Sequence, residues 1–132
     1  MSLDILTIAK NYLKALKLGK TGNDLAIFFN EDVEQVEMPN RLNPNGTTSN
    51  LTTLLEKAEE GKKILKSQDY TIKNAIVQDN TVVLELDWSG VLNIHIGTLN
   101  AGQTMKAHFV MFIDFKDGKI IHQRNYNCFE PF

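Results

Sequence analysis

Residues 117–132 read DGKIIHQRNYNCFEPF, and this stretch decides the fold. The pair Asp117-Gly118 is among the strongest short hairpin signals, because both positions of a tight two-residue turn favour such residues. It separates residues 109–115 from residues 120–129, two segments with the side-chain period of strands. The sequence therefore predicts an antiparallel hairpin in this part of the chain.

The turn also predicts which residues face each other, because a two-residue turn places Lys116 opposite Lys119. One face of the hairpin then carries the pairs Ile113–His122, Met111–Arg124 and Phe109–Tyr126. The other face carries Phe112–Gln123, Val110–Asn125 and His108–Asn127. A β-bulge would shift every pair by one residue and exchange the two faces, so the register stays a hypothesis.

Upstream of this hairpin, the apolar period changes from about 3.6 to 2 near Ser67, which indicates helices followed by strands. Asp79-Asn80 is a plausible second hairpin turn, and Ser49 or Asn50 is expected to cap a helix. The predicted helices are residues 5–16, 23–29 and 51–65, and the other predicted strands are 33–38, 70–77 and 81–91. We expect one α+β domain over residues 1–132.

Composition narrows the class of protein. The chain has 132 residues, 42% of them hydrophobic and 23% charged, with a formal net charge of −2, values typical of a globular domain rather than a nucleic-acid-binding one. No apolar run is long enough to span a membrane, so we expect no membrane partner. Cys128 is the single cysteine and cannot form an internal disulfide, which fits a cytoplasmic protein.

Four side chains are candidates for a ligand site: His122, Arg124 and Tyr126 on the predicted apolar face, and Trp88. Polar groups on a core-facing strand are costly unless they find a partner, so they gather where a cavity orients a ligand. The alternatives are structural. Arg124 would instead pair with a surface carboxylate, His122 would lie at the rim, and the two aromatic residues would only pack.

Glu37 is the candidate carboxylate, because apolar neighbours raise the pKa of a carboxyl group and suit it to acid/base chemistry. A solvated strand end is its alternative role. The three histidines lie too far apart in sequence to predict a metal site, and we expect neither a metal nor another cofactor.

The element order and residues 117–132 resemble the nuclear transport factor 2-like superfamily, in its SnoaL-like branch related to polyketide cyclases and ketosteroid isomerases. Residues 36–41 (VEMPNR) and Trp88 support the resemblance. It implies a cone-shaped, cystatin-like roll in which three N-terminal helices pack on a curved, mainly antiparallel sheet around an apolar pocket. It also implies a homodimer through the outer face of the sheet, with Val110, Phe112 and Ile121 in contact.

The resemblance gives Asn127 a special place, because relatives often carry an acidic residue there that shuttles a proton. Asparagine hydrogen-bonds but does not exchange a proton near neutral pH. Glu37 or His122 would then supply the acid/base group, and Tyr126 or Tyr12 would donate to the developing oxyanion.

Three functions stay open. The first is acid/base chemistry, of isomerase or cyclase type, on a small hydrophobic carbonyl compound, with Glu37, His122 and Asn127 as catalytic residues. Tyr12, Trp88, Arg124 and Tyr126 would bind the ligand. The second is non-catalytic binding of a hydrophobic small molecule, and the third is a dimeric protein-interaction module.

Overall fold

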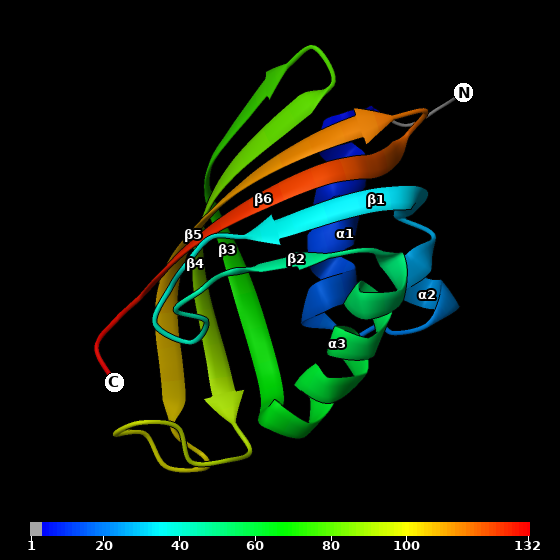
Figure 1. The fold of residues 1–132 in the computed structure, drawn as a ribbon. Helices are drawn as coiled ribbons and strands as arrows, with labels where there is room; N and C mark the ends of the chain where they lie inside the picture. Colours follow the sequence, from blue (N-terminus) through cyan, green and yellow to red (C-terminus); the bar gives the residue numbers. More distant parts are fainter. Residues whose placement is uncertain (1–3) are drawn as a thin grey trace.

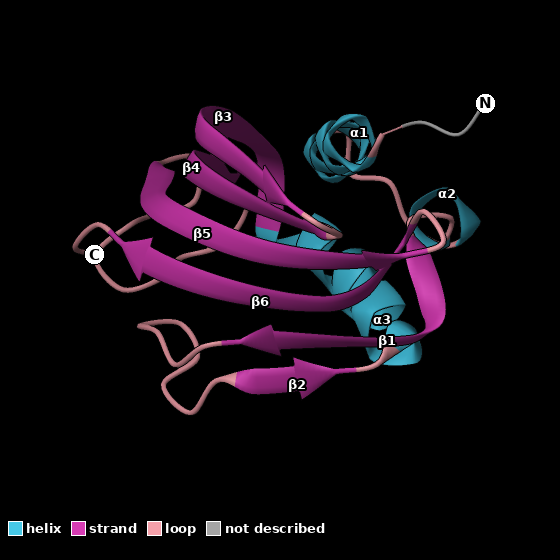
Figure 2. Cartoon of the chain, turned by 90° about the horizontal axis from the view of Figure 1, so that it is seen from above, coloured by secondary structure: helices cyan, strands magenta, loops and turns pink. Residues whose placement is uncertain are grey.

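The computed structural model describes residues 4–132, which form three helices and a six-stranded sheet (Figure 1). The helices are α1 (Ile5–Lys17), α2 (Asn23–Ala26) and α3 (Leu51–Ile64). Two of them precede the first strand, whereas α3 follows the second. The expectation of three N-terminal helices therefore holds for α1 and α2 but not for α3. Figure 2 shows them on one side of the curved sheet.

The two long helices begin at side-chain caps. Asp4 accepts a hydrogen bond from the backbone N–H of Thr7 at 2.8 Å, and Asn50 accepts one from that of Thr53 at 3.0 Å. Each cap satisfies a donor that the first turn of a helix leaves without a partner. Asn50, rather than Ser49, is thus the cap of α3.

The strands are β1 (Phe29–Glu37), β2 (Thr47–Ser49), β3 (Leu65–Gln78), β4 (Thr81–Leu92), β5 (Thr104–Lys116) and β6 (Lys119–Phe129). Their order across the sheet is β2-β1-β6-β5-β4-β3, and β1 runs parallel to β6 while the other neighbours are antiparallel. The short β2 was not predicted. It pairs only with β1, through residues 47–49.

Both predicted hairpin turns are confirmed. Asp79 and Asp117 have φ of 52°, and Gly118 has φ of 75°, so residues 117 and 118 are both in the left-handed region that tight hairpins require. Lys116 lies opposite Lys119, as expected.

The predicted register beyond this turn is wrong by one residue. Phe115 pairs with Ile120, but Asp114 pairs with His122, so Ile121 is an extra residue in β6. This β-bulge exchanges the two faces of the strand. The core-facing pairs are therefore Ile113–Gln123, Met111–Asn125 and Phe109–Asn127, and the outer pairs are Asp114–His122, Phe112–Arg124 and Val110–Tyr126.

The core lies between the helices and the concave face of the sheet. Strand β4 alternates strictly, with Val82, Leu84, Leu86 and Trp88 buried. From α1, Ala9, Tyr12 and Leu13 pack onto this face. Within residues 4–132 no helix is both long and apolar enough to cross a membrane.

Candidate functional site

A cavity of about 230 Å³ lies between the helices and the concave face of the sheet. Tyr12 and Leu16 of α1 and Leu54, Lys57 and Ala58 of α3 form one wall. The sheet contributes Gln35, Tyr70, Phe109, Met111, Gln123, Asn125 and Asn127. We call this cavity the inner pocket.

A row of amide side chains forms the polar part of the inner pocket. Gln123, which is 1% exposed, accepts a hydrogen bond from the Tyr12 hydroxyl at 3.1 Å and donates to Asn125 at 2.9 Å. The three β6 amides are two residues apart, so the strand period places them all on the concave face. The row is therefore fixed at one end by α1 and continues along β6 to Asn127.

Asn127 differs from the other two amides in having an unmatched acceptor. Its Oδ1 atom is buried and has no hydrogen-bond partner within residues 4–132. A buried acceptor without a donor costs on the order of 1–3 kcal/mol. A ligand with an O–H or N–H group would remove that cost.

The inner pocket has few groups able to exchange a proton. Burial raises the pKa of Tyr12 to about 12, outweighing the hydrogen bonds to Gln123 and Gln35 that lower it. Burial also raises the pKa of Tyr70, and the neighbouring Tyr12 adds to the effect. Both phenols stay protonated at neutral pH. Among the described residues that line the inner pocket there is no Asp, Glu or His.

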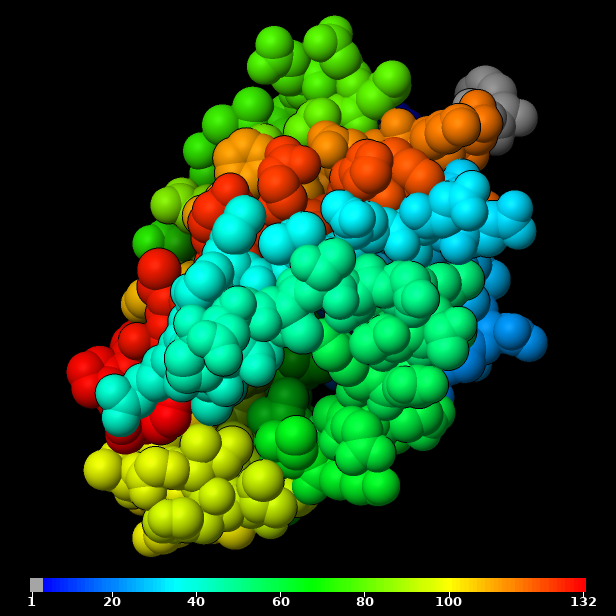
Figure 3. Space-filling view, viewed as in Figure 1, coloured from blue at the N-terminus to red at the C-terminus, as the bar shows by residue number. Residues whose placement is uncertain are grey.

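A second compartment of about 210 Å³ adjoins the inner pocket and shares Tyr70 and Phe109 with it. Apart from Gln68 and the shared Tyr70, its lining is apolar and includes Trp88, Leu92, Met105 and Phe129. Figure 3 shows its opening as a hollow between α3 and the loops at residues 38–46 and 93–103. We call it the apolar compartment.

Trp88 is held rigidly at the apolar compartment. Its ring stacks on Phe109, with centroids 5.3 Å apart and planes at 20°, and meets Phe129 edge-on at 6.1 Å. Its indole N–H donates to Gln68 at 3.0 Å. A ligand that entered this compartment would therefore lie against the Trp88 ring.

The structure separates the predicted site residues into two groups. Tyr12 and Asn127 line the inner pocket, and Trp88 lines the apolar compartment. His122, Arg124 and Tyr126 lie together on the outer face instead, because of the bulge at Ile121. Their proposed catalytic and binding roles at the pocket stay predictions, made on a register that the structure corrects.

On the outer face, Arg124 donates to Asp114 at 3.1 Å and lies over the ring of Phe112, 5.3 Å from its centroid. This is the surface carboxylate pair considered as its alternative role. Tyr126 is 39% exposed and packs edge-on against Phe112, next to the half-buried Val110. The homodimer through this face stays a prediction.

Glu37 is half-buried on β1, two residues beyond Gln35 and so on the same face. One oxygen of its carboxylate accepts from the amides of Asn40 and Asn43, at 2.7 and 2.9 Å. These bonds hold the loop that follows β1. Glu37 does not line the inner pocket.

Gln35, Gln123 and Asn125 were not predicted as site residues. The signal was present, because Gln123, Asn125 and Asn127 alternate along one strand next to an apolar strand. A polar row of this kind on a buried face marks a lined cavity or a hydrogen-bond network. Recognising this row required knowing which face of β6 points toward the core, and that face depends on the bulge at Ile121.

Comparison with known proteins adds to this geometry at the level of the fold. No family model matches the sequence, and no curated protein matches it. A SnoaL-like polyketide cyclase from Agrobacterium tumefaciens superposes with a TM-score of 0.73 at 14% identity, covering 96% of this chain and 92% of that one. An NTF2-like protein from Anabaena variabilis gives 0.71 at 16% identity, covering 100% and 96%.

A hypothetical protein with a ketosteroid isomerase-like fold from Catenulispora acidiphila, in complex with trimethylamine, gives a TM-score of 0.69 at 17% identity, covering 96% of this chain and 86% of that one. The chain thus has the nuclear transport factor 2-like fold. Its structural neighbours with this fold include a SnoaL-like polyketide cyclase and a ketosteroid isomerase-like protein, which confirms at the level of the fold the resemblance found in the sequence.

Proposed function

We propose that this protein is a non-catalytic binder of a small, mostly apolar molecule that carries a hydroxyl or other donor group. The apolar body would occupy the apolar compartment and the space beside Phe109. The donor group would bind Oδ1 of Asn127 once a rotation of the amide turns this buried atom toward the pocket; within residues 4–132 the atom has no other partner. This unmatched acceptor is the observation that carries the proposal.

The chemistry of the lining supports binding rather than proton transfer. A general acid or base needs a pKa near the working pH, and the phenol of Tyr12 has a pKa of about 12. The amide groups of Gln123, Asn125 and Asn127 hydrogen-bond without exchanging protons near neutral pH. Lys57 is the remaining ionisable side chain of the lining, and its ammonium group donates to the Ser49 hydroxyl at 2.8 Å. The lining therefore favours orienting a ligand over transferring a proton.

The size of the cavity limits the ligand. The inner pocket and the apolar compartment measure about 230 and 210 Å³, each below the range of roughly 300–1,000 Å³ typical of sites for drug-sized molecules. The ligand is accordingly either small or long enough to occupy both compartments.

A thermal-shift screen against apolar alcohols, hydroxy-ketones and phenols, followed by fluorescence titration of Trp88, tests this proposal. Saturating ligand, at about 100 times its Kd, stabilises the fold by roughly 2.7 kcal/mol. Asn127→Leu should weaken binding of a hit about tenfold, because one hydrogen bond in a buried site contributes about 1 kcal/mol or more. Tyr126→Phe, on the outer face, is the matched control and should leave the Kd unchanged.

The competing function is acid/base catalysis by Glu37. Incubating each hit with the protein and analysing it by chromatography and mass spectrometry distinguishes the two. Recovery of unchanged ligand supports the binder. Conversion to an isomer or a cyclised product, lost in Glu37→Gln, would replace our proposal with the enzyme.

A further inference from the structure

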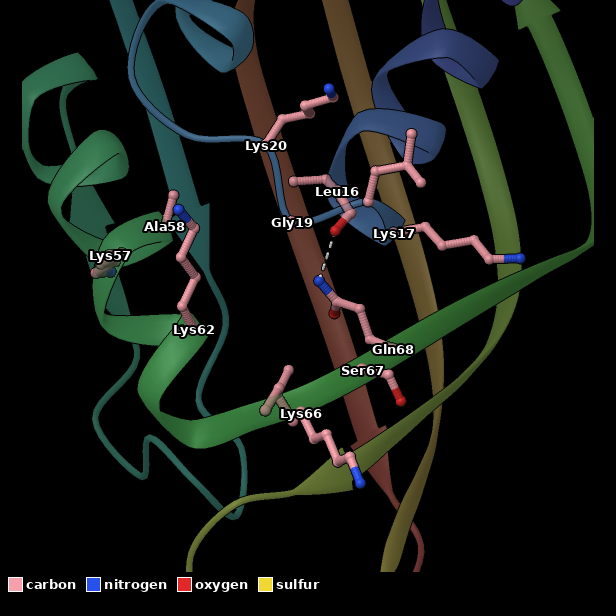
Figure 4. A pocket seen from close by; sticks show the side chains of 13 residues that line it. Leu16, Lys17, Gly19, Lys20, Lys57, Ala58, Lys62, Lys66, Ser67 and Gln68 are labelled. Carbon is pink, nitrogen blue, oxygen red and sulfur yellow. Dashed lines mark hydrogen bonds between the residues drawn. The ribbon is translucent and has the colours of Figure 1, made fainter.

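The outermost part of the cleft is a wide mouth of about 520 Å³ between the end of α1, the last turns of α3 and the start of β3. Figure 4 shows Lys17, Lys20, Lys57, Lys62 and Lys66 on different sides of it. Among the described residues that line this mouth there is no Asp or Glu. The mouth is therefore lined by a single sign of charge.

Nearby carboxylates only partly offset these lysines. Lys17 lies 3.0 Å from Asp69, and Lys62 lies 3.8 Å from Glu59. Five lysines against two carboxylates leave an excess of three positive charges, on a chain whose formal net charge is −2. The mouth is therefore positively charged, although the whole chain has a negative formal charge.

The helix ends explain part of the cluster but not all of it. Lys17 and Lys62 lie in the last turns of α1 and α3, where cations interact favourably with the negative end of the helix dipole. Lys20 and Lys66 lie outside both helices. Within residues 4–132 their ammonium groups make no hydrogen bond or ion pair with the protein, so their charge is available to a ligand.

The backbone holds Lys20 at the mouth. Gly19 has φ of 69°, and the N–H of Lys20 donates to the carbonyl of Ala15 at 3.0 Å, the bond that closes a helix C-terminus with a left-handed glycine. Lys66 is the second residue of β3, two residues after α3 ends. Both residues are thus placed by regular structure rather than by a long loop.

The mouth is continuous with the rest of the cleft. It shares Leu16, Lys57 and Ala58 with the inner pocket, and Gly61, Leu65 and Gln68 with the apolar compartment. A molecule whose apolar part lies inside would therefore present its outer end to the lysines.

We propose that the ligand of this protein is an amphipathic organic anion, with an apolar body in the inner compartments and a carboxylate or phosphate group at the lysine-lined mouth. This inference rests on the proposed function and adds the charge of the ligand to it. A single-sign cleft with apolar walls also raises the local concentration of such anions.

The test is a set of probes with one apolar chain and different head groups: octanoate, octyl phosphate, 1-octanol and octylamine. Binding is followed by the fluorescence of Trp88 at low salt and at about 1 M salt, where the screening length falls to roughly 3 Å. We expect at least one of the two anions to bind on the order of fivefold or more tightly than octanol, and octylamine to bind more weakly than octanol. The preference should shrink at high salt.

Two double variants complete the design. Lys20→Gln/Lys66→Gln removes two charges that make no hydrogen bond or ion pair within the described chain. This variant should weaken binding of the anion on the order of fivefold while leaving binding of octanol unchanged. Lys73→Gln/Lys116→Gln removes two exposed charges away from the mouth and should leave both unchanged.

The outcomes separate the two proposals. If octanoate or octyl phosphate shows the preference and the mouth variant abolishes it, the inference holds, and the tighter of the two identifies the head group. If octanol binds as well as both anions, or the mouth variant has no effect, the ligand is not selected by charge although the pocket still binds. If no probe changes the fluorescence of Trp88 or the melting temperature, both proposals fail.

Discussion

The hydrogen bond between Tyr12 and Gln123 joins α1 to the middle of the sheet, and its removal is a direct test of the structure. The Tyr12 side chain is 2% exposed, the Gln123 side chain is 1% exposed, and the donor and acceptor oxygens lie 3.1 Å apart. Tyr12→Phe deletes the hydroxyl and keeps the ring contacts with Phe28 and Phe29, at centroid distances of 5.8 and 5.5 Å.

The expected magnitude follows from the group left behind. Tyr12→Phe leaves the Gln123 carbonyl oxygen buried without its donor, which costs about 1–3 kcal/mol of the free energy of unfolding. Gln123→Leu leaves both the Tyr12 hydroxyl and the Asn125 carbonyl oxygen without this partner. We expect the free energy of unfolding to fall by about 3 kcal/mol. Replacing both partners by apolar groups removes the shared penalty, so the double variant should lose less than the sum by about 1–2 kcal/mol.

Urea denaturation of the wild type, both single variants and the double variant measures this coupling. The transition is followed by Trp88 fluorescence and, as an independent probe, by far-UV circular dichroism, because coincident transitions justify two-state treatment. Strictly additive losses, or a Tyr12→Phe variant as stable as the wild type, would refute the hydrogen bond as drawn.

Three further predictions concern pH, packing and charge. The pKa of Tyr12 is about 12 in the folded state and near 10 in the unfolded state, so the folded state holds this proton more tightly. The free energy of unfolding should therefore fall as pH rises from 10 to 12, by about 3 kcal/mol at most. The urea midpoint of Tyr12→Phe should decline less steeply over that range than the midpoint of the wild type. Gly90→Ala places a Cβ atom 2.7 Å from the Trp88 ring. Urea denaturation should show a free energy of unfolding lower by about 1–3 kcal/mol, and the Trp88 emission should shift. Ser89→Ala is the control. Asp114→Asn removes the ion pair between Asp114, whose side chain is 28% exposed, and Arg124, whose side chain is 37% exposed. The free energy of unfolding should fall by about 1 kcal/mol or less, and thermal denaturation should show a smaller loss in 1 M salt.

Local signals in the sequence predicted the elements well. Asp79, Asp117 and Gly118 fix the two turns because few other residue types adopt a positive φ. Asn50 caps α3 because its side chain replaces a missing backbone partner. The three-residue strand β2 escaped detection, since its pairing with β1 depends on the loop between them rather than on its own composition.

The candidate site was only partly predictable, for a physical reason. Tyr12, Trp88 and Asn127 were placed at the cleft, but the face of β6 depended on whether Ile121 was paired or bulged. The turn sets the register only as far as Phe115 and Ile120. Tertiary packing decides the rest, and a single sequence does not encode it in a local motif.

Because of the bulge at Ile121, the sequence of β6 contains two alternating sets of side chains, and the register decides which set lines the cavity. As folded, Gln123, Asn125 and Asn127 face the cavity; if Ile121 were instead paired with Asp114 in a regular ladder, the alternation would turn His122, Arg124 and Tyr126 inward. A shift of β6 by one residue against β5 would thus exchange an uncharged, hydrogen-bonding surface for one bearing an imidazole, a guanidinium and a phenol. In evolutionary terms, the sequence of β6 already contains a second possible lining, separated from the present one by a one-residue change of register.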